Sequence, residues 1–182
     1  MGNIEFFGGS SSGPKSVEDS IFEVENASIV FKASWMSTPR DINRAARVSA
    51  TAMEHLDHIV NEILRARDTS MAKGTYSGSI LEVHLDEECG SIYTPASSAE
   101  HMEMINSGPG NGQLPDAGSP IKFVKLITKI KHRHHNSANF RIENDRHFFV
   151  VNVDKPNKTP DSILDIDVQQ FCDHCKVVAQ HL

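Results

Sequence analysis

The sequence has few cysteines, no long apolar run and no excess of positive charge. Three cysteines among 182 residues are an odd count, too small for a disulfide scaffold, so we expect a reduced, cytoplasmic protein. No apolar run approaches the roughly 18 residues of a membrane span, and the first residues lack the basic and apolar parts of a secretory leader. We therefore expect no membrane association. A net charge of −6 excludes a globally basic nucleic-acid binder but allows a local basic patch.

Several nucleotide-binding signatures are also missing. The stretch from Gly108 to Gly112 follows no convincing strand and lacks the Lys-Ser/Thr pair of a phosphate-binding loop. No dinucleotide fingerprint is present either, and no cofactor is expected.

The composition predicts one folded domain with an N-terminal tail. Hydrophobic residues make up 38% of the chain, which is enough to bury a core. Residues 1–19 are rich in Gly and Ser and predict a flexible tail. We expect a single domain over residues 20–182, with a Gly/Pro-rich loop at 107–120.

The periodicity of apolar residues predicts an α+β fold. A helical period favours a long helix over 38–67 in the N-terminal half and shorter helices over 98–106, 121–131 and from 167 to the end. Alternating patterns predict hairpins over 20–34 and 139–153, and a strand over 79–86 that pairs with residues 92 and 93. Two prolines, at 156 and 160, indicate a loop before the last helix. Regular βαβ alternation is absent, so we expect a long helix and shorter helices packed with antiparallel β-hairpins.

A basic, histidine-rich segment from 122 to 147 is the most informative stretch. It has a local charge of +5 in a chain whose remainder sits at −11. Such asymmetry is typical of an anion-binding patch, although a solvated face paired with the acidic remainder explains it too. Nucleic acid or another polyanion is the expected partner, but beyond Phe140 the segment has few aromatic residues for stacking. The candidate binding residues are Lys122, Lys125, Lys129, Lys131, Arg133, Arg141 and Arg146.

Histidines in this segment could act as general acid or base. His134 and His135 are the candidates for catalysis by a small hydrolase or ribonuclease, since imidazole titrates near neutral pH. Five residues separate Arg141 from His147, a spacing that resembles HEPN ribonucleases. In that family the motif lies near a helix end, whereas here it falls in a predicted hairpin.

Two weaker clusters could hold a metal. Cys172 and Cys175 form a CxxC pair without a second pair, and both fall on the apolar face of the last predicted helix, which favours buried thiols over zinc. His55, His58 and Glu62 share one face of the long helix, as a facial triad requires, although a plain polar face is the simpler explanation.

Three functions remain open from the sequence. The first is a binding or regulatory module that uses the basic segment on an anionic partner. The second is the small hydrolase or ribonuclease, metal-dependent or similar to the HEPN enzymes. The third is a structural protein, such as a homo-oligomer, without catalytic activity.

Overall fold

The computed structural model describes residues 16–182, apart from the side chains of residues 135 and 136. The predicted tail therefore lies outside the described residues up to residue 15, and residues 17–19 belong to the first helix rather than to a tail. In chain order, the elements are α1 (Val17–Met36), α2 (Ile42–Ala72), α3 (Ile80–Asp86), β1 (Glu88–Tyr93), α4 (Ser98–Asn106), β2 (Ser119–Lys122), α5 (Phe123–Lys131), β3 (Arg133–Glu143), β4 (Arg146–Asp154), β5 (Pro160–Asp167) and α6 (Val168–Ala179).

The strands form one antiparallel sheet. Its order is β2-β1-β5-β4-β3, so β5 lies at the centre although it is the last strand in the chain. The predicted α+β fold with antiparallel strands is confirmed. Within the described residues, no helix is long and apolar enough to cross a membrane.

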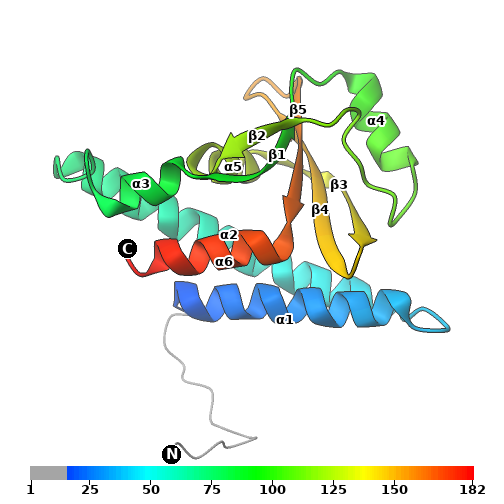
Figure 1. Ribbon diagram of the computed structural model, residues 1–182. Helices are drawn as coiled ribbons and strands as arrows, with labels where there is room; N and C mark the ends of the chain where they lie inside the picture. Colours follow the sequence, from blue (N-terminus) through cyan, green and yellow to red (C-terminus); the bar gives the residue numbers. More distant parts are fainter. Residues whose placement is uncertain (1–15) are drawn as a thin grey trace, which may run out of the picture.

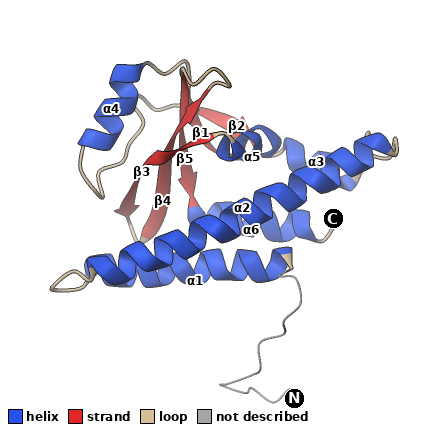
Figure 2. Cartoon of the chain, turned by 180° about the vertical axis from the view of Figure 1, so that it is seen from behind, coloured by secondary structure: helices blue, strands red, loops and turns tan. Residues whose placement is uncertain are grey.

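Helices cover the two faces of the sheet unequally (Figures 1 and 2). One face packs against α1, α2, α5 and α6, and the main core forms there around Val151, Val153 and Leu164. The opposite face packs against α4, with Val150 and Ile163 in a smaller core. We call these the helix face and the outer face. Because side chains of a strand alternate between faces, neighbouring residues of β4 and β5 reach different cores.

The β3–β4 hairpin agrees with the sequence prediction. Its strands join at Asn144 and Asp145, which both have positive φ, as a tight two-residue turn requires. The pairing places Ile142 opposite His147 and Phe140 opposite Phe149. These residues share the helix face of the hairpin, since directly paired residues point to the same side.

The predicted hairpin over 20–34 is wrong, because these residues form most of α1. Ser16 and Asp19 make a reciprocal capping box that starts the helix. Ile21, Val24 and Phe31 then recur at helical spacing and are buried against the rest of the fold. Tertiary packing overrides the strand preference of the β-branched residues here.

The strand predicted over 79–86 is also wrong. Leu81 and Leu85 fit either period, but Val83 between them is 58% exposed, and the segment is helix α3, capped by Ser79.

The central strand β5 is an element that the sequence analysis does not predict. It begins at Pro160, inside the expected loop, and continues to the cap of the last helix. Polar residues such as Asp161 and Asp165 interrupt its apolar pattern, although Leu164 between them is fully buried.

The remaining helices agree with their predictions apart from their ends. The long helix is α2, which begins after the cap Asp41 rather than at Pro39 and continues to Ala72. The predicted helix over 98–106 is confirmed as α4, and α5 begins at Phe123. Asp167 caps α6, at the predicted start of the last helix.

Candidate functional site

The basic segment is largely neutralised within the chain. Five of its seven cationic side chains bind carboxylates of α2, α3 and β5, elements that carry much of the acidic remainder. The positive run in the sequence therefore disperses into separate ion pairs in the fold. These pairs are Lys122 with Asp86, Lys129 with Asp161, Arg133 with Asp57, Arg141 with Asp165, and Arg146 with Asp167.

The five pairs also lie on different faces of the sheet. Arg133 donates two hydrogen bonds to Asp57 of α2, at 2.6 and 2.8 Å. Arg141 lies on the outer face instead, where its guanidinium stacks 4.0 Å from the ring of Phe148. Arg141 and His147 consequently point to opposite sides of the hairpin, so the spacing that resembles HEPN ribonucleases does not form a shared site.

Two lysines of the segment lie outside these ion pairs. Within residues 16–182, Lys125 and Lys131 take part in no ion pair, and both are exposed. His134 is exposed on β3, and the side chain of His135 lies outside the described residues. A catalytic role for these two histidines stays a prediction.

The candidate metal residues have other partners. His55 and His58 both hydrogen bond to Ser20 of α1, at 3.2 and 2.9 Å, and Glu62 pairs with Arg65. The described side chains contain no group of three or more His, Cys, Asp or Glu residues placed to hold a metal ion. The two histidines thus act as polar contacts between α1 and α2.

Cys172 and Cys175 are fully buried in the main core together with Cys89. Burial raises the thiol pKa of Cys172 and of Cys89 to about 12, and it raises the pKa of Cys175 well above 9. A metal ligand or redox thiol needs an accessible thiolate, which such burial disfavours.

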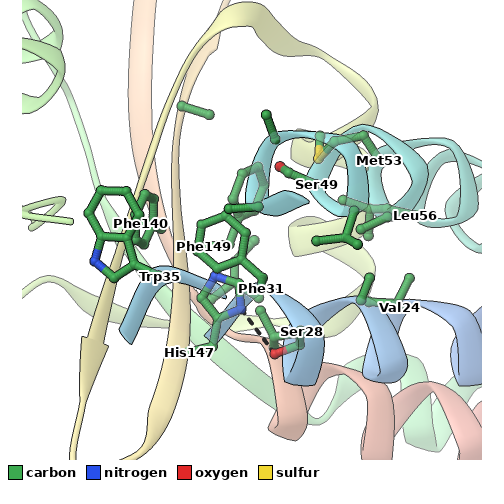
Figure 3. Close-up of a pocket in the computed structure, with 18 of the residues that line it drawn as sticks. Val24, Ser28, Phe31, Trp35, Ser49, Met53, Leu56, Phe140, His147 and Phe149 are labelled. Atoms are coloured by element: carbon green, nitrogen blue, oxygen red, sulfur yellow. Dashed lines mark hydrogen bonds between the residues drawn. The ribbon is translucent and has the colours of Figure 1, made fainter. Parts of the chain in front are cut away.

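A cavity of about 290 Å³ lies between α1, α2 and the helix face of the sheet (Figure 3). Its walls are largely apolar, and α5 and α6 contribute to them as well. Lining residues are Val24, Ala27, Ser28, Phe31, Trp35, Ile42, Ala45, Ala46, Val48, Ser49, Ala52, Met53, Leu56, Ile130, Ala138, Asn139, Phe140, His147, Phe149, Ile166, Val168 and Phe171.

Small residues at the start of α2 explain why this space stays open. Further along the helix, Ile59 and Ile63 fill the corresponding space in the core. The helix therefore packs closely near its middle and leaves a gap near its beginning. The small residues that line the gap over the first turns are Ala45, Ala46, Ser49 and Ala52.

Aromatic rings form the wall that faces these small residues. The ring of Phe31 stacks on His147 with centroids 4.8 Å apart and meets the edge of Phe140 at 4.6 Å. Trp35 lies edge-on to Phe140 at 4.8 Å, and the guanidinium of Arg40 covers it at 4.4 Å. Such ring contacts stabilise the wall of the cavity.

His147 and Ser28 supply a polar pair in this apolar wall. The Nδ1 of His147 and the hydroxyl of Ser28 are 2.9 Å apart (Figure 3). Burial, with a smaller contribution from the charge of Lys32, lowers the pKa of His147 from 6.5 to about 4, although Asp167 opposes the shift. The imidazole is therefore neutral at pH 7 and can exchange a hydrogen bond without carrying charge.

The Gly/Pro-rich loop is fixed to the sheet beside the cavity. The amide of Asn139 donates to the carbonyls of Met104 and Gly108, each at 3.0 Å. Gly110 lies so close to Trp35 that an added Cβ would come within 3.2 Å of the indole ring. The loop thus supports the aromatic wall from outside.

Sequence reasoning misses this site because its residues lie far apart. The signal that the sequence does carry is the Ala/Ser-rich run from 45 to 52, together with a helical spacing of Ser28, Phe31 and Trp35. The spacing of Ser28, Phe31 and Trp35 is informative only if these residues are recognised as part of a helix.

Comparison with known proteins identifies no similar protein. No family model, curated protein or solved structure matches the chain.

The buried thiols give a first prediction. At pH 8 the folded protein should leave its three cysteines almost unreactive towards a disulfide reagent such as DTNB, because burial keeps them protonated and inaccessible. All three should react when guanidinium chloride unfolds the chain. Rapid reaction of Cys172 or Cys175 in the folded protein, followed by release of thionitrobenzoate, would contradict this.

His147 gives a pH-dependent prediction. In the unfolded chain the imidazole binds a proton near pH 6.5, whereas in the folded protein it does so only near pH 4, because its pKa is lowered. Its neutral form therefore stabilises the fold above pH 6.5, and this contribution is lost as the pH falls from 6.5 to 4. At pH 5 the loss should be roughly 2 kcal/mol.

The measurement is urea unfolding at pH 7 and pH 5 for the natural protein and for His147→Phe. The variant should lose less unfolding free energy between the two pH values, by about 2 kcal/mol. His132→Phe, a change at an exposed histidine, is the matched control and should behave as the natural protein does. Equal pH dependence in all three proteins would refute the assignment to His147.

Proposed function

We propose that the chain is a non-catalytic binding domain for a small, uncharged and largely apolar ligand. The observation that carries this proposal is the cavity between α1, α2 and the sheet, with its aromatic wall and polar His147–Ser28 pair. Its volume of about 290 Å³ lies at the lower end of the range for small-molecule sites. The proposed ligand is therefore compact, such as a ring system with one hydrogen-bonding group.

The chemistry of the walls supports an uncharged ligand. A charged group would lose its hydration among Phe31, Phe140 and Phe149, at a cost that one neutral His147–Ser28 pair does not offset. A flat apolar body gains by burying its surface against fixed rings, and a single polar atom of the ligand finds its partner in the pair.

The same pair supports binding rather than catalysis. A serine nucleophile needs a base that is itself oriented by a third group. Among the described residues, no carboxylate forms a hydrogen bond or ion pair with His147. The lowered pKa of His147 also makes it a weak base at neutral pH.

Ligand binding can be measured with an uncharged fluorescent probe, N-phenyl-1-naphthylamine. Trp35 is the only tryptophan and lines the cavity, so energy transfer from it reports occupancy directly. We expect saturable one-to-one binding with a dissociation constant on the order of 1–10 μM. Ala52→Phe should fill the cavity and weaken binding at least tenfold, at about 1.4 kcal/mol for each factor of ten.

Ala50→Phe is the matched control, because it makes the same substitution at an exposed alanine of α2 that does not line the cavity. This variant should bind the probe as the natural protein does. Thermal unfolding of both variants establishes that each one folds. Unsaturable binding by the natural protein would overturn the proposal. Tight binding to a folded Ala52→Phe variant would do so as well.

Binding to an anionic partner is a second candidate. It is favoured by Lys125 and Lys131, which are exposed near His132 and form no ion pair within the described residues. The surface that this candidate would use is thus much smaller than the full basic segment.

This candidate predicts that charge reversal at Lys125 and Lys131 removes salt-dependent binding of labelled RNA, because phosphate contacts to lysine release counterions. Fluorescence anisotropy at two salt concentrations measures the loss. Lys73→Glu with Lys155→Glu is the control, since both lysines are exposed elsewhere and the change in net charge is the same. If both double variants weaken RNA binding equally, the loss of binding reflects net charge alone, and Lys125 and Lys131 do not form the binding site.

A further inference from the structure

The outward side of α1 carries a largely apolar seam whose three large side chains stay exposed within the described residues. The seam consists of Phe22, Asn26, Ile29, Ala33 and Met36. Phe22, Ile29 and Met36 are 59%, 61% and 69% exposed, which is unusual for large apolar side chains aligned on one helix. The five positions alternate by four and three residues, the spacing of a helix-pairing seam.

The seam lies opposite the face by which α1 joins the fold. Residues Val24, Ala27 and Phe31 are buried against the rest of the molecule, and a helical period places them half a turn away from Phe22 and Ile29. The fold of the monomer therefore does not need the seam residues to be apolar.

Charges at the two ends of the seam are opposite in sign. The acidic side chains exposed around its beginning are Glu18, Asp19 and Glu23. Three exposed arginines follow its end, near the start of α2: Arg40, Arg44 and Arg47. None of these six side chains forms an ion pair within residues 16–182.

We propose that the seam is the interface of a homodimer in which α1 packs antiparallel against α1 of a second copy. A two-fold axis near Ile29 would place Phe22 of one copy beside Met36 of the other. It would also bring the acidic end of each seam to the three arginines of its partner. A parallel arrangement would bring like charges together at both ends, which costs affinity.

This inference is independent of the proposed function, because the cavity and the seam occupy opposite faces of α1. The interface spans about 20 Å of helix, so we expect a dissociation constant on the order of 10–100 μM. Sedimentation equilibrium should show a mass near 20.1 kDa in dilute solution that rises towards twice this value with concentration. A monomer at about 500 μM would overturn the proposal.

Ile29→Glu should abolish the dimer at every concentration tested while retaining binding of the naphthylamine probe. Val83→Glu is the matched control, since Val83 is 58% exposed on α3 and lies outside the seam. An undiminished dimer in Ile29→Glu would refute the seam. Loss of probe binding in a dimeric control would instead count against the cavity.

The charges test the antiparallel orientation. Glu18→Arg with Glu23→Arg should weaken the dimer at least tenfold, and adding Arg44→Glu with Arg47→Glu should restore it. Failure of the second pair to rescue the first would contradict the proposed pairing of opposite ends.

Cross-linking tests the orientation directly. Phe22→Cys and Met36→Cys variants are mixed and oxidised by oxygen with a copper catalyst, and oxygen accepts the two electrons and two protons that each new disulfide releases. Disulfides should join the two different variants, because the antiparallel arrangement places residue 22 of one copy beside residue 36 of the other. The native thiols are buried and should not take part. Disulfides formed only between identical variants would show parallel helices and overturn the proposal.

Discussion

The central position of β5 is the constraint on which the rest of the structure depends. This strand pairs with β1 on one side and β4 on the other, and its residues alternate between the two cores. Its register sets that of β4, which sends His147 and Phe149 to the helix face and Phe148 to the outer face. The cavity therefore forms on the helix face. The ion pairs of Arg141 and Arg146 form on the outer face, to which β5 directs the acidic partners of both arginines.

Local signals in the sequence are sufficient where they have one meaning. The Asn144–Asp145 turn, the cap Asp167 and the helical period of α2 each specify one conformation, and the structure contains the predicted hairpin, last helix and long helix at these places. Predictions fail where an apolar pattern is compatible with both a helix and a strand. Leu81 and Leu85 fit both a strand and a helix, and only packing decides between them. Strand β5 escapes prediction because its buried residues are interrupted by aspartates whose partners come from β3, β4 and α5.

The candidate site is harder to predict for the same reason. The charge run from 122 to 147 is visible in the sequence, but its meaning depends on acidic partners such as Asp57 and Asp161, which lie in elements distant along the chain. The cavity is invisible because it is a gap, created by small residues of α2 opposite aromatic residues of α1, β3 and β4. If α1 is taken for a hairpin, nothing in the sequence predicts a contact between Ser28 and His147.

Burial of the three thiols has a consequence for the lifetime of the protein. In the folded core they are protected, but an unfolded chain exposes cysteines of ordinary reactivity, and only two residues separate Cys172 from Cys175. A disulfide formed at that moment would have to be accommodated inside α6, where both sulfurs are tightly packed. We therefore expect heat inactivation to depend on the redox state of the solution, with reductant favouring recovery after unfolding and oxidant favouring irreversible loss.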